Sequence, residues 1–224
     1  MKHLSPEDRD LVTAAVTAAE AKSDGEIVTI VAEQSDAYHD VGLHYAVLAM
    51  LLVPVIWGLL PRAVVDWGLS LILGWNYQLA RGTLMTILFV KLAGAFLIVR
   101  YALAWMPLRM ALTPRATKAR RVRRRALQYF HVGAERRTVG RTGVLLYLSL
   151  AERRAEIVTD EAIASKVAPA VWGDAMAALI AEVKAGRPGH GMAETVRQIG
   201  DVLAEHFPKS STDRNELPDR LVEL

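Results

Sequence analysis

Apolar residues gather in one central stretch of this 224-residue chain. Residues 43–60 contain no formally charged side chain, and residues 83–106 contain only Lys91 and Arg100. A helix needs about 20 apolar residues to cross a bilayer, so the two stretches predict two membrane spans. Residues 63–80 between them carry Trp, Tyr and Asp side chains, which are typical of an interfacial loop or a short amphipathic helix.

The two cations of the second predicted span allow two interpretations. Lys91 and Arg100 could line a site for an ion or an anionic ligand, or each side chain could reach towards its nearer membrane interface. Neither predicted span contains an acidic residue that would pair with them. The pattern therefore favours the second interpretation.

Outside residues 43–106 the pattern predicts a mixed α/β domain. A helix begins after Ser5, with Pro6 at its first position, and a strand rich in β-branched residues follows at 26–32. Later elements are a basic helix at 116–131, strands at 143–150 and 154–159 joined by a tight hairpin at 151–153, and helices at 169–185 and 192–206 separated by a glycine-rich link at 186–191.

The first strand needs partners from the far side of the apolar stretch. A single strand preceded by one helix can neither bury its faces nor satisfy its edges, so strand 26–32 should pair with the strands at 143–159. Their pairing requires an even number of membrane crossings. The expected fold is a small α/β domain interrupted by a two-helix transmembrane hairpin. Its parts are an N-terminal piece at 1–42, the hairpin at 43–106, a basic juxtamembrane helix at 107–131, the rest of the domain at 132–207 and a loosely packed tail at 208–224.

The net charge of +3 hides a local excess of basic residues. Basic residues near span ends mark the cytoplasmic side, which predicts a multi-pass protein of the cell membrane with both termini in the cytoplasm. No cleavable signal peptide is expected. The cluster that carries this prediction contains eight basic and no acidic residues: Arg109, Arg115, Lys118, Arg120, Arg121, Arg123, Arg124 and Arg125.

Three interpretations of this basic cluster remain open. It is a topology signal on a solvated helix face, a site of attraction to anionic lipid headgroups, or a nucleic-acid site. The third lacks a recognised fold and interleaved aromatic residues. The partners we expect are therefore the lipid bilayer and a membrane protein, with no nucleic acid.

Carboxylates near the predicted strand ends are the candidate catalytic or metal-binding groups. Asp160 and Glu161 are the catalytic candidates, and Asp24, Glu26 and Asp160 are the metal candidates, because hard cations prefer oxygen ligands. Each also has a structural interpretation: Asp160 as a helix N-cap, Glu161 in the first helical turn, Asp24 in a turn. Glu152 in the hairpin would pair with an arginine at the surface.

No motif of a known catalytic or cofactor site adds to these candidates. The six histidines are scattered and the chain has no cysteine, so neither a zinc site nor a disulfide is expected. Phosphate-binding loops, dinucleotide fingerprints and EF-hand loops are also missing from the sequence. We therefore expect no cofactor, with calcium as the alternative.

Several segments together resemble the TPM domain family, in particular a bacterial membrane-bound branch of it. They are AEAKSDGEIVTIV ending at Val31, RTGVLLYLSLAERRAEIVTDE at 141–161, Trp172, the glycines at 189–191, HFP at 206–208 and NELP at 215–218. The resemblance implies an α/β/α sandwich with a mixed sheet. Some members are described as acid phosphatases or calcium binders, and others as photosystem-repair proteins or accessory subunits of membrane receptors.

Two functional hypotheses follow. The sequence favours a non-enzymatic module that binds a partner, or serves assembly or maintenance, at the cytoplasmic membrane face. The alternative is a calcium- or metal-assisted acid phosphatase. Whether the chain is an enzyme at all is left open at this point, since each candidate carboxylate also has a structural interpretation.

Overall fold

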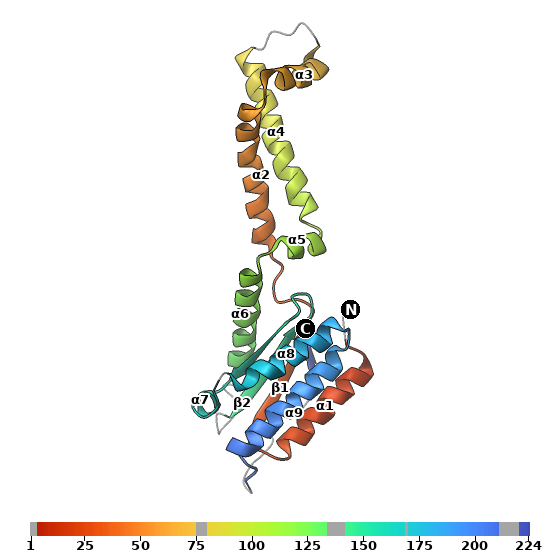
Figure 1. Cartoon of the computed structure of the whole chain (residues 1–224), viewed down its shortest axis with the longest axis vertical. Coiled ribbons are helices and arrows are strands. Elements are labelled where there is room, and N and C mark those ends of the chain that lie inside the picture. The colour runs from red at the N-terminus through yellow and green to blue at the C-terminus, as the bar shows by residue number, and fades with distance from the viewer. Residues whose placement is uncertain (1–3, 75–79, 134–141, 169, 211–219) are drawn as a thin grey trace. The chain divides into compact units, whose positions relative to one another are not determined.

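A computed structural model of the chain describes residues 4–74, 80–133, 142–168, 170–210 and 220–224 (Figure 1). The chain divides into two compact units. One consists of residues 1–37 and 114–224 and is called the α/β unit, and the other consists of residues 38–113 and is called the hairpin unit. The N-terminal piece thus ends, and the hairpin unit begins, a few residues before the predicted boundary at residue 42.

The α/β unit begins with the helix that the sequence predicts. The Ser5 side chain accepts a hydrogen bond from Asp8 N at 3.0 Å, and Pro6 occupies the first helical position of α1. Such an N-cap satisfies an amide that has no partner inside the helix. The described elements of this unit are α1 (Pro6–Glu20), β1 (Glu26–Ala32), α6 (Arg115–Gly133), β2 (Gly143–Ser149), β3 (Arg154–Thr159), α7 (Glu161–Ala164), α8 (Val171–Lys184), α9 (Pro188–His206) and β4 (Val222–Glu223).

One four-stranded sheet, in the order β3-β2-β1-β4, joins the two separated pieces of the unit. Strand β1 pairs in parallel with β2, with Ile30 opposite Tyr147. Strand β3 pairs antiparallel with β2, with Ala155 opposite Leu148. The predicted pairing across the insertion is therefore confirmed.

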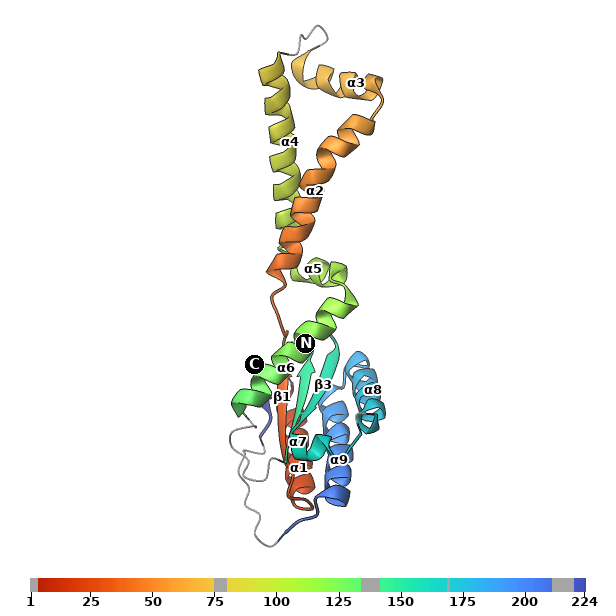
Figure 2. The same cartoon turned by 90° about the vertical axis from the view of Figure 1, so that its left-hand side faces the viewer.

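Helices cover both faces of this sheet (Figures 1 and 2). One face packs on α1, α8 and α9 through a core that includes Val12, Leu146 and Ile199. The other packs on α6, where Val122 and Phe130 meet β1 and β2. The mixed sheet between two helical layers confirms the predicted α/β/α sandwich.

The last long helix starts earlier than the glycine pattern predicts. Helix α9 begins at Pro188, so most of the expected link at 186–191 is helical. Only Gly186, at φ +81°, has the left-handed conformation that favours glycine. The later glycines permit close helix packing instead, since a Cβ at Gly189 would clash with the Asp8 side chain of α1.

Within the expected tail at 208–224, residues 222–223 form strand β4 of the sheet, and residues 211–219 lie outside the described residues. Val222 lies opposite Ile30 in the β1–β4 pair, and Leu224 N donates to Val31 O at 2.9 Å. Glu223 accepts from Leu4 N at 3.2 Å and forms an ion pair with Arg9 at 2.8 Å. The pairing with β4 satisfies backbone hydrogen-bonding groups of β1 that would otherwise lack a partner strand.

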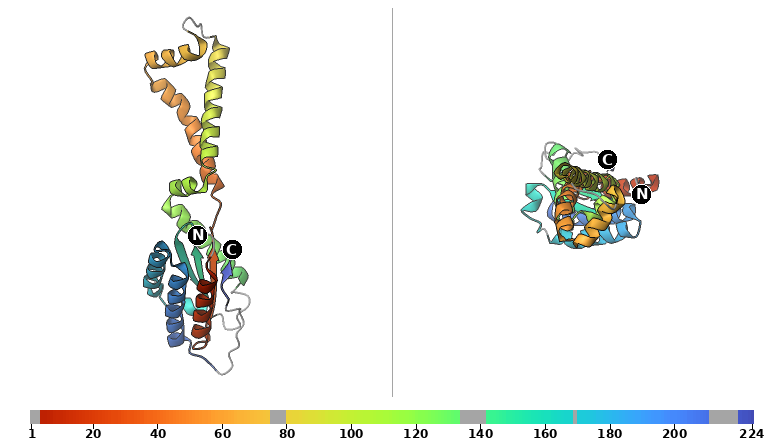
Figure 3. Two further views of the ribbon diagram at one scale, coloured as in Figure 1. Left: turned by 90° about the vertical axis from the view of Figure 1, so that its right-hand side faces the viewer. Right: turned by 90° about the horizontal axis from the view of Figure 1, so that it is seen from above.

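The hairpin unit consists of α2 (His39–Leu59), α3 (Arg62–Leu73), α4 (Arg81–Ala102) and α5 (Met106–Leu112). Its α2 and α4, of 21 and 22 residues, are long and apolar enough to cross a membrane. They pack together at one end and diverge towards α3 (Figures 2 and 3). The second predicted span extended to residue 106, but α4 ends at Ala102 and α5 follows.

Two cations of the hairpin unit have specific contacts. Lys91 Nζ on α4 lies 3.9 Å from the centroid of the Trp57 ring on α2, a cation–π contact. Arg109 is 5% exposed and donates to Leu103 O at 2.7 Å and Ala104 O at 2.9 Å. Arg109 thereby satisfies carbonyls in the turn between α4 and α5.

Candidate functional site

A buried polar cluster lies at the carboxyl ends of β1 and β2. Ser35 N, beyond the end of β1, donates to Glu152 Oε1 at 3.0 Å. The other carboxylate oxygen, Oε2, accepts from Ser149 Oγ at the end of β2. The Ser35 and Tyr147 hydroxyls are hydrogen-bonded to each other at 3.0 Å. Glu152 is therefore a buried hydrogen-bond acceptor, and its expected place at the surface of an exposed hairpin is wrong.

Burial changes the pKa of the tyrosine in this cluster. It raises the pKa of Tyr147 to about 12, against an opposing effect of the hydrogen bond with Ser35. Burial likewise raises the pKa of Glu156 on β3, although Arg123 and Arg154 oppose that shift. The Tyr147 hydroxyl stays protonated near neutral pH and serves as a fixed hydrogen-bond partner.

A groove beside this cluster opens at the β3 edge of the sheet. It has a volume of about 740 Å³ and lies between the first turn of α6, the β2–β3 turn and α8. Its basic lining residues are Arg115, Lys118, Arg153, Arg154 and Lys184, its one acid is Glu152, and its apolar lining is Ala155, Met176, Ala177, Ile180 and Ala181. We call it the basic groove.

The positive charge of the basic groove is weakly compensated within the described part of the chain. Both Glu152 oxygens accept hydrogen bonds from Ser35 and Ser149. None of the five cations forms an ion pair with a described residue, although Arg154 interacts electrostatically with Glu156. A groove with this lining attracts an anion.

Arg153 occupies a backbone conformation that arginine seldom adopts. Its φ is +49°, in the left-handed region that favours glycine or asparagine. Residues held in such conformations cost about 1 kcal/mol or more and are found preferentially at functional sites. Arg153, which has this conformation, also lines the basic groove.

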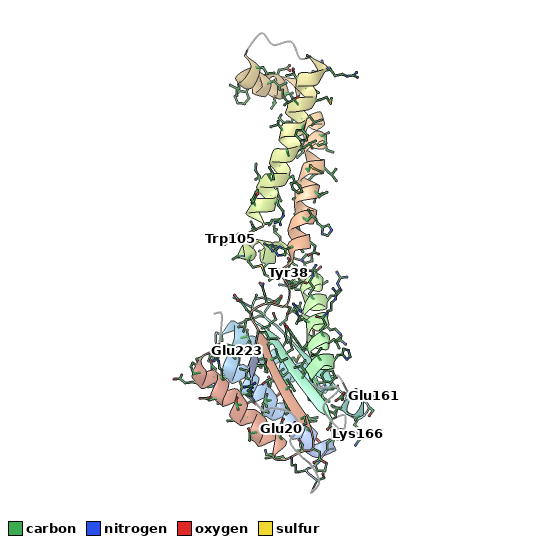
Figure 4. The ribbon with its side chains drawn as sticks, turned by 180° about the vertical axis from the view of Figure 1, so that it is seen from behind. Glu20, Tyr38, Trp105, Glu161, Lys166 and Glu223 are labelled. Atoms are coloured by element: carbon green, nitrogen blue, oxygen red, sulfur yellow. The ribbon has the colours of Figure 1, made fainter. Side chains whose placement is uncertain are left out.

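The carboxylates predicted as catalytic or metal-binding groups lie at the opposite end of the strands, away from the polar cluster. Strand β3 runs antiparallel to β2, so the end of β3 lies at the amino ends of β1 and β2, where Asp24 precedes β1 and Glu26 is its first residue. Ligands of α/β sheets normally gather at the carboxyl ends of parallel strands. Glu20 and Glu161 lie towards the amino-end side of the unit in Figure 4, and Glu223 lies towards the other side.

Each of these predicted carboxylates has a structural place. Asp160 occupies the predicted N-cap position of α7, but its side chain makes no cap hydrogen bond there, and its Oδ2 accepts from Gly143 N at 3.0 Å. Asp24 Oδ1 accepts from Ser210 N at 2.7 Å. Glu26 is buried, and Glu161 lies exposed in the first turn of α7. The described residues include no group of three or more acids or histidines able to hold a metal ion.

The eight basic residues of the predicted topology signal divide by their contacts. Arg109 is buried in the hairpin unit, and Arg115 and Lys118 line the basic groove. Three others hold parts of the α/β unit together: Arg121 pairs with Asp36, Arg123 with Glu156, and Arg125 donates to Ser35 O. The remaining two, Arg120 and Arg124, are exposed on α6.

Sequence reasoning missed the polar cluster and most of the basic groove. Ser35, Tyr147 and Ser149 come together only through the β1–β2 register, which no local pattern gives. Lys184 joins Arg153 and Arg154 because α8 packs beside β3. The adjacent arginines after Glu152 are a local signal, but the predicted hairpin accounts for them as surface residues.

Comparison with known proteins finds a family match and a solved structure of the same fold. The TPM domain family model matches residues 107–202. A solved structure, described as the NMR structure of BA42 protein from the psychrophilic bacterium Bizionia argentinensis, shares the fold with a TM-score of 0.55 and 16% sequence identity, covering 99% of this chain and 95% of that one. No curated protein matches the chain. The predicted resemblance to the TPM domain family is confirmed.

Proposed function

Since residues 107–202 carry a TPM domain, we propose that this protein is a membrane-anchored, non-enzymatic module whose α/β unit binds and supports a membrane-protein partner at the cytoplasmic face. The apolar helices α2 and α4 anchor it in the bilayer. The basic residues after α4 orient the α/β unit towards the cytoplasm.

The observation that carries the proposal is that buried carboxylates near the strand ends accept hydrogen bonds from backbone amides. Glu152 and Asp160 accept hydrogen bonds from Ser35 N and Gly143 N, and Glu20 Oε1 accepts from Ile27 N at 2.8 Å. A metal-assisted hydrolase needs converging carboxylates with lone pairs directed at an ion. Here these groups hold backbone amides, as expected of a scaffold.

The hairpin unit offers a place for the partner. Where α2 and α4 diverge, they and α3 line a cleft of about 710 Å³ that includes Pro54, Trp57, Gly58, Leu84 and Leu88. In a bilayer, helices associate by close packing, and small residues at the interface favour it. We assign this cleft to a transmembrane helix of the partner.

Gly58 allows this assignment to be tested without disturbing the hairpin itself. A Cβ at Gly58 would meet no atom within 4 Å, and the same holds for Gly82, which lies outside the cleft. The full chain with Gly58→Leu, with Gly82→Leu and without change is purified from native membranes in mild detergent, and co-purifying proteins are identified by mass spectrometry. We expect one membrane protein to accompany the wild type and Gly82→Leu but to be lost with Gly58→Leu.

Two results would contradict the proposal. One is the same set of proteins with all three chains. The other is turnover of a generic phosphate monoester by the purified chain, dependent on calcium and abolished by Asp160→Asn. That second result would establish the alternative, the metal-assisted acid phosphatase.

A further inference from the structure

We infer that the basic groove binds the phosphate headgroup of an anionic phospholipid from the membrane in which the chain is anchored. This inference rests on the membrane anchorage in the proposed function but not on the protein partner. The groove is lined entirely by residues of the α/β unit.

Charge complementarity identifies the ligand as an anion. Five cations line the groove, and the one acid among its lining residues accepts hydrogen bonds from Ser35 N and Ser149 Oγ. Arg115 and Lys118 also lie in the first turn of α6, which contains no acidic residue. The helix dipole makes this end positive, so cations here raise the local potential further. A bound phosphate relieves both sources of repulsion.

The remaining lining identifies the anion as amphiphilic. Met176, Ala177, Ile180 and Ala181 form one apolar strip along α8 beside the cations. A free phosphate ion makes no use of such a strip, whereas the glycerol and upper acyl segments of a lipid bury apolar area against it. Arg115 also follows closely on the hairpin unit, which ends at Thr113. The chain itself therefore tethers the groove to a bilayer.

The conformation of Arg153 agrees with a binding role. A glycine at φ +49° would relieve the backbone, yet an arginine occupies this position and lines the groove. Arg153→Gly therefore separates stability from binding. It removes a cation of the groove while leaving the fold as stable as the wild type or more so.

The test uses the full chain in nanodiscs of phosphatidylcholine with or without phosphatidylglycerol. Hydrogen exchange of residues 151–155 and 171–184 is measured as the anionic lipid content rises. We expect phosphatidylglycerol to protect both segments. Arg154→Gln with Lys184→Gln should raise the phosphatidylglycerol content needed for half-maximal protection by about thirty-fold. Each basic side chain near an anionic membrane surface strengthens binding about five-fold, and the variant lacks two of them. Arg153→Gly should also weaken protection, with an unchanged or higher thermal midpoint.

The matched control removes two charges from α6 outside the groove. Arg120 and Arg124 are exposed and do not line it, so Arg120→Gln with Arg124→Gln should leave protection within about two-fold of the wild type. Equal losses in both double variants would show diffuse attraction and overturn the inference. So would equal protection by glycerol phosphate or inorganic phosphate, which would make the ligand a soluble phosphate, or no protection by phosphatidylglycerol.

Discussion

At the scale of residues, Glu152 ties together three parts of the α/β unit. Its carboxylate accepts from Ser35 N and Ser149 Oγ, and it precedes the strained Arg153. A buried acceptor removed from such a network leaves donors without partners. The local function of Glu152 is therefore to fix the segment through which the chain leaves β1 for the hairpin unit.

Glu152→Gln should lower the stability of the full chain by about 1–3 kcal/mol. The new amide can accept from Ser35 N and donate to Ser149 Oγ, but the hydrogen bonds of a neutral amide are about half as strong as those of a carboxylate. Thermal unfolding in detergent, followed by circular dichroism, measures the loss. Glu205→Gln at an exposed position of α9 is the control and should change stability by less than about 0.5 kcal/mol. Equal thermal midpoints of the two variants would refute this role.

Tyr147 should make stability dependent on pH in the alkaline range. Its pKa is about 12 in the folded chain against 10.0 ordinarily, so the folded state holds the phenolic proton more tightly. The stability gained is fully present below pH 10 and is lost as the pH rises towards 12. The free energy of unfolding should therefore fall by up to about 2 kcal/mol across this window.

The comparison that checks this uses Tyr147→Phe, which removes the titrating group. Its unfolding free energy should fall less steeply than that of the wild type at high pH, because no phenol titrates at this position. Tyr101→Phe, a change at an exposed position of α4, should keep the wild-type slope. A parallel pH dependence of the wild type and Tyr147→Phe would count against the burial of this hydroxyl.

At the scale of elements, α1 and α9 pack closely because of a glycine. A Cβ at Gly200 would lie 2.5 Å from Ala19 Cβ and 3.1 Å from Ala19 Cα, so the clash includes backbone. Gly200→Ala should therefore force the helices apart and lower stability by about 1–3 kcal/mol.

Gly173 provides the matched substitution for this prediction. It lies in α8, and a Cβ there would meet nothing within 4 Å. Gly173→Ala should raise stability by up to about 1 kcal/mol through helix propensity alone. Opposite shifts of the thermal midpoint in the two variants are the expected result, and a stabilising Gly200→Ala would contradict the close packing.

The elements that the sequence predicted well are those with strong local patterns. Helix α1, strands β1 and β3 and the basic helix α6 all lie within a few residues of their predicted bounds. The start of α9 was missed because glycines that serve packing against Asp8 and Glu182 look like a linker. Strand β4 was missed because it has two residues and is formed entirely by pairing with β1.

The candidate site depended on strand direction, which the local pattern does not give. Asp160 follows a strand, so the sequence predicts it at the end of the sheet where ligands bind. Because β3 runs antiparallel to β2, Asp160 faces the amino end of the parallel pair and binds Gly143 N. The polar cluster and the basic groove lie towards the carboxyl ends of β1 and β2, where residues from four separate segments meet.

At the scale of the whole molecule, the proposed membrane anchorage must satisfy one constraint. Strands β1 and β2 are hydrogen-bonded neighbours, although the whole hairpin unit lies between them in the sequence. A chain that leaves one strand and returns to the next must cross the bilayer an even number of times. The two long apolar helices α2 and α4 meet this requirement, with α3 between them.

Site-directed labelling tests this constraint most directly, since the chain has no cysteine of its own. Ala21→Cys, Ser165→Cys and Ala80→Cys each place one thiol at an exposed position: before β1, after β3 and between α3 and α4. In sealed membrane vesicles, a membrane-impermeant maleimide should reach Ala21→Cys and Ser165→Cys from the cytoplasmic side and Ala80→Cys from the opposite side. Labelling of Ala21→Cys and Ser165→Cys from opposite sides would contradict the account.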